Sequence, residues 1–167
     1  MNWLFRLLGY VPSEERRGIR LESSRFWKVT SVRDAEVFLK SLPLLMPEGS
    51  VLYLEDLLES EVRDFVEARP APNPVKVALG TIWPRPHWYH MPLTQKNVTE
   101  LAELVDEHSV ALLCIHIHAY HEGKVLLEWH DAFGKDPMLI SPDVAEDKVK
   151  TFAAATGSSY SMEAHSG

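Results

Sequence analysis

The sequence predicts a single α/β domain, built on one mixed sheet of about five to six strands that is mostly parallel and covered by helices. Segments typical of strands and of helices alternate along the chain, and strand–helix–strand connections normally join parallel strands. The chain has 167 residues, of which 46% are hydrophobic, and this is enough to build one core. No internal repeat and no long linker divides it.

Two strand signals occur in the first half of the chain, each followed by a helix signal. Aromatic and β-branched runs mark the strands, while an N-capping residue followed by apolar residues at helical spacing marks each helix. Prolines end both helices. The predicted elements are a strand at 25–30, a helix from Ser31 to Pro43, a strand at 50–54, and a helix from the capping pair Asp56 and Glu59 to Pro70.

The second half predicts further strands and helices by the same signals, and it contains one hairpin. The hairpin is predicted because only a few residues around Glu122-Gly123 separate two strand-like runs. It is the one antiparallel pair expected in the sheet. The predicted elements are a strand at 75–82, a helix after Thr94, hairpin strands at 109–120 and 124–131, a helix from Ser141-Pro142 to Gly157, and an edge strand at 158–162.

The N-terminal residues are apolar, but they do not predict a membrane span. The run at 3–8 is far shorter than the ~20 residues that cross a bilayer. We expect it to pack on the body, with contact to a membrane surface as the alternative. The chain then divides into an N-terminal apolar segment 1–20, packed or partly mobile, an α/β domain 21–163, and a disordered tail 164–167.

Charge and cysteine content limit the class of partner. Seventeen basic against twenty-four acidic residues give a net charge of −7, which argues against a nucleic-acid binder. Residues 41–69 hold two basic and seven acidic residues, so they predict an acidic face that would suit a basic protein partner, with a solvated surface that only keeps the protein soluble as the alternative. A single cysteine, Cys114, forms no internal disulfide, which favours a cytoplasmic location.

One hairpin strand carries several histidines, which form a candidate metal site. His116 and His118 share one face of a strand, because side chains alternate along it. Glu128 and His130 on the partner strand would complete a polar face with the ligand types that zinc or a similar divalent ion prefers. The same residues also fit a solvated face without metal.

The length of the hairpin loop decides what faces the histidines. A two-residue loop would pair His118 with Leu127, whereas a three-residue loop with Gly123 at positive φ would bring Glu128 and His130 to the histidine face. We favour the three-residue loop, because it also gathers the aliphatic side chains on the opposite face.

The segment 83–92 (WPRPHWYHMP) is a candidate binding loop. Its three prolines stiffen the backbone and deny it regular hydrogen bonding. Tryptophan, tyrosine and arginine dominate the hot spots of protein interfaces. A loop that simply covers the core is the alternative. The candidate binding residues are Trp83, Arg85, His87, Trp88, Tyr89 and His90.

These observations predict a non-catalytic partner-binding module of the immunity or adaptor kind, without a cofactor. No glycine-rich phosphate loop, nucleophile elbow or catalytic triad order is visible. The alternative is a metal-dependent hydrolytic enzyme in which three histidines hold zinc and Glu128 is a fourth ligand or the base that activates water. A non-catalytic binder of a small ligand is a third possibility.

Overall fold

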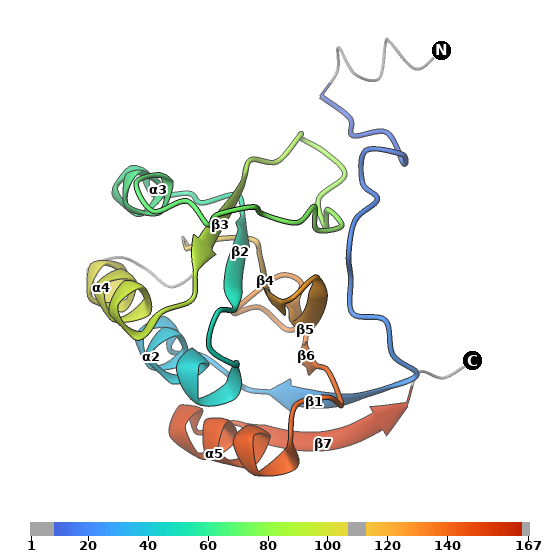
Figure 1. Ribbon diagram of the computed structural model, residues 1–167, viewed down its shortest axis with the longest axis vertical. Helices are drawn as coiled ribbons and strands as arrows, with labels where there is room; N and C mark the ends of the chain where they lie inside the picture. Colours follow the sequence, from blue (N-terminus) through green and yellow to red (C-terminus); the bar gives the residue numbers. More distant parts are fainter. Residues whose placement is uncertain (1–8, 107–112, 165–167) are drawn as a thin grey trace.

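A computed structural model describes residues 9–106 and 113–164 of the chain and shows one sheet with helices packed against it (Figure 1). The sheet contains seven strands. The elements in these residues are β1 Arg25–Thr30, α2 Ala35–Leu45, β2 Val51–Glu55, α3 Ser60–Glu67, β3 Trp88–Pro92, α4 Gln95–Asp106, β4 His116–His121, β5 Lys124–Trp129, β6 Met138–Ile140, α5 Glu146–Thr156 and β7 Ser159–Ala164.

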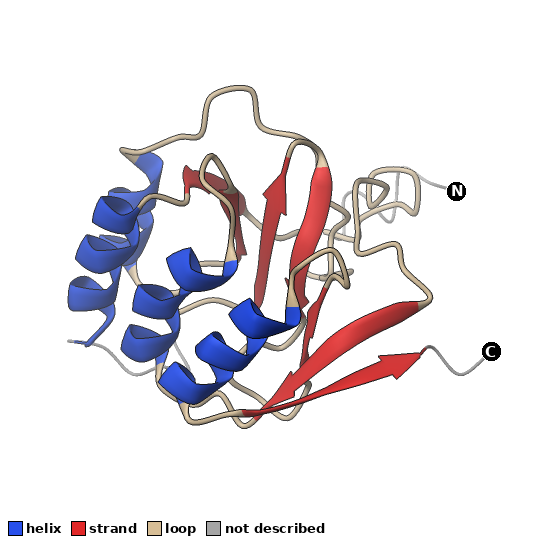
Figure 2. Cartoon of the chain, turned by 60° about the horizontal axis from the view of Figure 1, so that its bottom comes forward, coloured by secondary structure: helices blue, strands red, loops and turns tan. Residues whose placement is uncertain are grey.

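The prediction of a mostly parallel sheet is wrong, because every pair of neighbouring strands is antiparallel. The strand order is β3-β2-β4-β5-β6-β1-β7, so the expected five to six strands become seven. A single sheet with helices packed on it is nevertheless what the structure contains (Figure 2).

The helical connections explain why the prediction failed. Strands two positions apart in an antiparallel sheet run in the same direction. α4 joins β3 to β4 with β2 between them, and α5 joins β6 to β7 with β1 between them. α4 and α5 therefore each connect two strands that run in the same direction, as crossover helices do in a parallel sheet. In each case an antiparallel strand from another part of the chain lies between the two. The local sequence contains no pattern that predicts this insertion.

Two strands lie where the sequence does not predict them. The run 75–82 is not a strand, because within it only Val77 forms an isolated bridge, to Ile19. β3 occupies 88–92 instead, so half of the predicted loop 83–92 is an edge strand. Pro92 is tolerated at its end, since an edge strand leaves one row of backbone groups unpaired. The short β6 lies between prolines that are typical of turns.

Helix ends also differ from the prediction, for reasons of capping. Asp34 caps α2 by accepting a hydrogen bond from the Val37 amide at 2.9 Å, so Ser31 is not the cap. α2 continues through Pro43 to Leu45, so the predicted end of this helix at the proline is wrong. α5 ends at Gly157 (φ 63°) as predicted. No helix in the described residues is long and apolar enough to span a membrane.

The sheet has two covered faces of different character. The helices bury one face in the main core, which contains Phe38, Leu101 and Phe152. Irregular backbone covers the other face, here called the second face (Figure 2). This covering backbone has two parts, the strap (residues 9–22) and the covering loop (residues 71–87). Residues 1–8, the run for which membrane contact is an alternative, lie outside the described residues, as do 107–112 and 165–167.

Phe38 gives a direct test of the main core. Its side chain is fully buried, with ring centroids 5.3 to 6.1 Å from those of Trp129, Phe133 and Phe152. We expect Phe38→Ala to lower the free energy of unfolding by about 3–5 kcal/mol, measured by chemical denaturation. Leu44→Ala on the same helix is the control, because Leu44 is exposed and should cost less than about 1 kcal/mol. Equal losses would contradict this packing.

Candidate functional site

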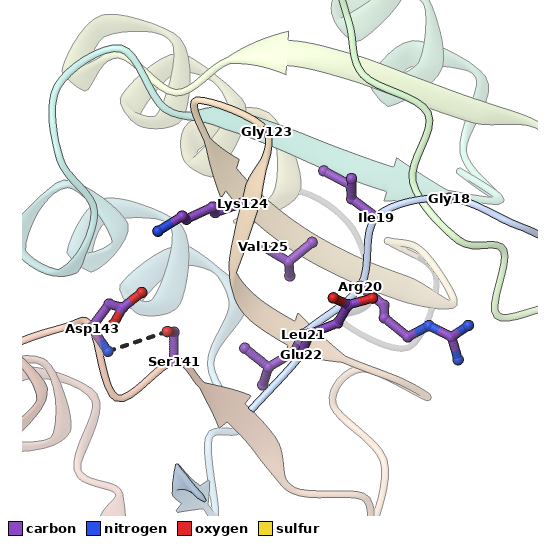
Figure 3. Close-up of a pocket in the computed structure, with 10 residues that line it drawn as sticks. All are labelled: Gly18, Ile19, Arg20, Leu21, Glu22, Gly123, Lys124, Val125, Ser141 and Asp143. Carbon is purple, nitrogen blue, oxygen red and sulfur yellow. Dashed lines mark hydrogen bonds between the residues drawn. The ribbon is translucent and has the colours of Figure 1, made fainter. Parts of the chain in front are cut away.

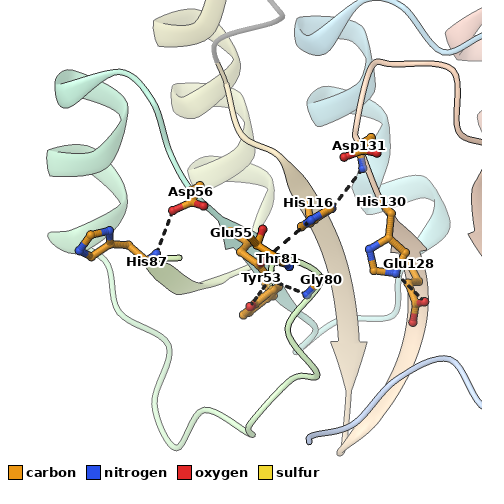
Figure 4. A network of polar contacts seen from close by, with 10 residues as sticks. All are labelled: Tyr53, Glu55, Asp56, Gly80, Thr81, His87, His116, Glu128, His130 and Asp131. Atoms are coloured by element: carbon orange, nitrogen blue, oxygen red, sulfur yellow. Dashed lines mark hydrogen bonds and ion pairs between the residues drawn. The ribbon is translucent and has the colours of Figure 1, made fainter. Parts of the chain in front are cut away.

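The structure brings the four predicted metal-site residues together on the second face. His118 on β4 lies directly opposite Glu128 on β5. His130 follows β5, and its ring centroid is 4.9 Å from that of His116 and 5.2 Å from that of His118. We call His116, His118, Glu128 and His130 the histidine cluster; all but His118 are seen with their neighbours in Figure 4.

The three-residue hairpin loop is wrong, although the face it predicts for these residues is right. His121 pairs with Lys124, which leaves a two-residue turn whose residues, Glu122 (φ 48°) and Gly123 (φ 78°), both have positive φ. A β-bulge then shifts the register between Ala119 and Tyr120. The extra residue of the bulge moves Glu128 opposite His118. The two-residue turn and the β-bulge together thus place the same side chains on the same face as a three-residue loop would.

Glu128 joins the histidine cluster to the strap. One carboxylate oxygen accepts a hydrogen bond from the Leu21 amide at 2.8 Å, and the other lies 3.0 Å from His130 Nε2. His118 Nδ1 is 3.9 Å from the same carboxylate, beyond hydrogen-bond distance. Glu128 therefore anchors the covering backbone as well as a histidine.

Glu55 has the same role for the covering loop. Its carboxylate is fully buried and accepts hydrogen bonds from the amides of Thr81 (2.7 Å) and Gly80 (3.1 Å) and from the Tyr53 hydroxyl (2.9 Å). His116 Nε2 lies 3.9 Å away. Figure 4 shows Glu55 between Tyr53 and the loop backbone. No motif in the sequence marks Glu55 as an acceptor for the covering loop, because a lone glutamate at the end of a strand carries no pattern.

Burial and hydrogen bonding set opposite pKa shifts in the cluster. Burial lowers the pKa of His118 to about 3, and it also lowers the pKa of His116. The hydrogen bond to Glu128 raises the pKa of His130 against the effect of burial. Burial tends to raise the pKa of Glu128, but the hydrogen bonds from His130 and Leu21 outweigh it and leave the pKa below its usual value. His118 and His116 are therefore neutral at pH 7.

The geometry does not support the zinc hypothesis. Among residues 9–106 and 113–164, no group of three His, Cys, Asp or Glu side chains is arranged to hold a metal ion. The donor atoms are committed elsewhere, since His116 Nδ1 accepts a hydrogen bond from the Asp131 amide at 3.1 Å and Glu128 holds Leu21 and His130. Only the two ring nitrogens of His118 are buried without a partner in this cluster. Metal binding and catalysis by Glu128 stay predictions.

The six predicted binding residues do not form one surface. Trp83 and Trp88 are exposed by 57% and 44%, whereas Tyr89 is partly buried. His90 belongs to the second face, where its Nδ1 lies 3.0 Å from the Tyr120 hydroxyl. Arg85 forms an ion pair with Glu15 of the strap at 2.7 Å.

We call residues 82–88 the aromatic loop, and the structure adds to it two residues that the sequence did not single out, Ile82 within it and Tyr10 beside it. Ile82 is half exposed, and Tyr10 of the strap packs against Trp83 with ring centroids 6.1 Å apart. Beside the loop lies a groove of about 280 Å³. It is lined by Glu67, Arg85, Pro86, His87, Trp88 and Tyr89. Tyr10 and Glu67 come from distant parts of the chain, so no local motif could have revealed them.

A second hollow, of about 340 Å³, lies between the strap, the β4–β5 hairpin and the turn before α5 (Figure 3). Its charged residues are two cations, Arg20 and Lys124, and two anions, Glu22 and Asp143. All four are exposed. The lining contains neither histidine nor cysteine, so this hollow offers no nucleophile or general base of those types.

Comparison with models of protein families, with curated proteins and with solved structures finds no significant match to this chain. The function must therefore be inferred from the geometry.

Glu55→Gln tests whether Glu55 anchors the covering loop. Both carboxylate oxygens accept hydrogen bonds, so either orientation of the amide places its NH₂ group against another donor. We expect a loss of about 2–3 kcal/mol in the free energy of unfolding and faster hydrogen exchange at the Gly80 and Thr81 amides. Glu103→Gln, at an exposed position on α4, is the control. Unchanged exchange at those two amides would contradict the anchoring role.

The buried histidines predict that mild acid destabilises the fold. His118, with a pKa of about 3, stays neutral when folded, whereas in the unfolded chain it takes up a proton as the pH falls through about 6.5. His116 and His90 act in the same direction. His130 opposes them, because its raised pKa adds stability below pH 6.5 that is lost as the pH rises through its folded value. From pH 7 to pH 5 the stability should fall, by about 2 kcal/mol from His118 alone.

The measurement is the free energy of unfolding at pH 7, 6 and 5 for the wild type and for His118→Leu. The variant should show a smaller loss on acidification, whatever its stability at pH 7. His87→Leu, at an exposed position, serves as the control and should keep the wild-type slope. A His118→Leu slope equal to that of the wild type would show that His118 is not held neutral by burial.

Proposed function

We propose that the chain is a non-catalytic protein-binding module that recognises its partner through the aromatic loop and the groove beside it. The observation that carries this proposal is the exposure of Trp83 and Trp88 on a loop that is fixed at both ends. Tryptophan is the residue type most enriched among interface hot spots. Together with the half-exposed Ile82, these side chains offer apolar area to a partner.

The loop is held in place by contacts along its whole length. At its start the Val11 amide donates to the Ile82 carbonyl at 3.1 Å, next to the amides that Glu55 holds. In its middle Arg85 is paired with Glu15. At its end the His87 amide donates to Asp56 Oδ1 at 2.9 Å, and the Asp56 amide donates to the His87 carbonyl at 2.8 Å. Such preorganisation reduces the loss of conformational entropy on binding.

The charge around the groove supports a partner with basic residues at its rim. Glu67 lines the groove. The pKa of Tyr89 is raised mainly by burial, and the nearby Glu67 carboxylate adds to this increase. Asp64 and Glu61 are also exposed on α3. Arg63 offsets part of this charge, but residues 41–69 as a whole are acidic. An apolar centre with complementary charges around it is the usual anatomy of a specific interface.

We place this function in the cytoplasm. Cys114 is a free, buried thiol, and burial raises its pKa above the usual value. It is therefore an inert core residue, in keeping with a protein that folds in a reducing compartment without disulfides.

The test compares two variants in quantitative capture experiments from cell extract, with chemical crosslinking to retain weak complexes. Trp83→Ala combined with Trp88→Ala should lose the specific partner, and its Kd for the purified partner should rise at least about 100-fold. Leu44→Ala is the matched control, because it removes an exposed apolar side chain from α2, and it should retain the partner. The same captured proteins with both variants, or no specific partner at low salt, would refute the proposal.

A further inference from the structure

β7 is an edge strand without the features that usually protect such strands. It closes one end of the sheet and pairs, among the described residues, with β1 alone (Figures 1 and 2). All six of its residues are in continuous register with β1, without a bulge. It contains no proline and no lysine, and its one charged residue, Glu163, is paired with Lys28 of β1. Natural edge strands are normally blunted by such residues or by a covering segment.

The opposite edge of the sheet shows the contrast. β3 ends in Pro92, and its His90 carbonyl accepts a hydrogen bond from the Ala71 amide at 2.8 Å. Helix α3 also packs beside β3. These features block the addition of another strand at β3. Of the two edges of the sheet in the described residues, the β7 edge therefore offers the long, regular row of backbone groups for pairing.

The residues of β7 are complementary to a second copy of themselves. In an antiparallel pair centred on Ser161, Tyr160 lies opposite Met162 of the other copy, and Ser159 lies opposite Glu163. Tyr160 and Met162 already pack partly against the main core, so their pairing would extend that core with a favourable sulfur–aromatic contact. The two Glu163 residues would be four positions apart, about 14 Å, and so well screened from each other.

We infer that the chain forms a symmetric homodimer in which the two β7 strands pair antiparallel about Ser161 and join the sheets of both copies. This register keeps the helices of the two copies on the same side of the joined sheet. Figure 1 shows β7 at the end of the molecule away from the covering loop, so both aromatic loops stay accessible in the dimer. The inference is independent of what the aromatic loop binds.

The expected affinity is modest. Six strand residues span about 20 Å, which gives an interface at the small end of the range for specific complexes. We expect a Kd for dimerisation of roughly 10–100 μM, measured by sedimentation velocity over a range of concentrations. Ser161→Lys places like charges directly opposite each other at the centre of the interface and should weaken dimerisation at least about tenfold. Gln95→Lys, at an exposed position on α4, adds the same charge elsewhere and should not.

Site-specific crosslinking tests the register. Directly opposite residues in an antiparallel pair have Cα atoms about 4.5–5.5 Å apart, which suits a disulfide. Ser161→Cys should therefore form a disulfide-linked dimer under mild oxidation. Ser159→Cys lies on the same strand and the same face, but its two copies would be about 14 Å apart and should not link. Cys114 is buried and does not compete.

A wild-type chain that remains monomeric at about 500 μM, well above the expected Kd, would overturn the inference. So would a dimer that Ser161→Lys leaves intact, or one in which Ser161→Cys fails to crosslink or Ser159→Cys crosslinks equally well. Both serines are exposed on the strand surface, so the cysteine substitutions should leave the fold intact. The lysine introduced by Ser161→Lys would lie opposite Lys28 of β1 in the same chain, so the thermal unfolding midpoint must show that the Ser161→Lys variant stays folded.

Discussion

Two carboxylates on the second face, the fully buried Glu55 and the largely buried Glu128, attach the covering backbone to the sheet. Glu55 accepts the amides of Gly80 and Thr81, and Glu128 accepts the amide of Leu21. Without these bonds the strap and the covering loop would bring backbone N–H groups into a buried layer without partners, at a cost of about 1–3 kcal/mol each. The strap and the covering loop satisfy some of their backbone groups between themselves, as in the hydrogen bonds of Ile19 with Lys76 and Ala78, but not these three amides. The sheet therefore supplies acceptors from its side chains.

This arrangement explains why the histidine cluster resembles a metal site and yet is not built as one. A metal ion needs three or four donor atoms turned to one point, about 2 Å away. Here Glu128 faces the strap and His130, and His116 faces the Asp131 amide. The same bonds position the aromatic loop, because the backbone that Glu55 holds continues directly into Ile82 and Trp83. The ionisable residues at the centre of the sheet thus fix the position of the aromatic loop, the surface that we propose for partner binding.

The sequence was most informative about local structure and about residue faces. Hydrophobic alternation in 115–130 was enough to place His116, His118, Glu128 and His130 on one side, even though the predicted turn was wrong, because burial of aliphatic side chains decides parity. Strand order was beyond its reach, since β2 lies between β3 and β4 through pairings distant in the chain. The groove at Trp88 was also hidden, because its wall includes Glu67 from α3.

Occupation of the second face determines where recognition can take place. Among the described residues, the helices cover one side of the sheet, and the strap and covering loop cover the central strands β2, β4 and β5 on the other side. What remains is the periphery: the loop at one end of the molecule and the unprotected strand at the other. Residues at the periphery are not constrained by packing in the core. The types of these residues can therefore indicate an interaction surface, but their spacing in the sequence does not indicate its shape. A pattern such as WPRPHW therefore predicts a binding surface, whereas the position of that loop depends on its contacts with Glu55, Asp56 and Glu15.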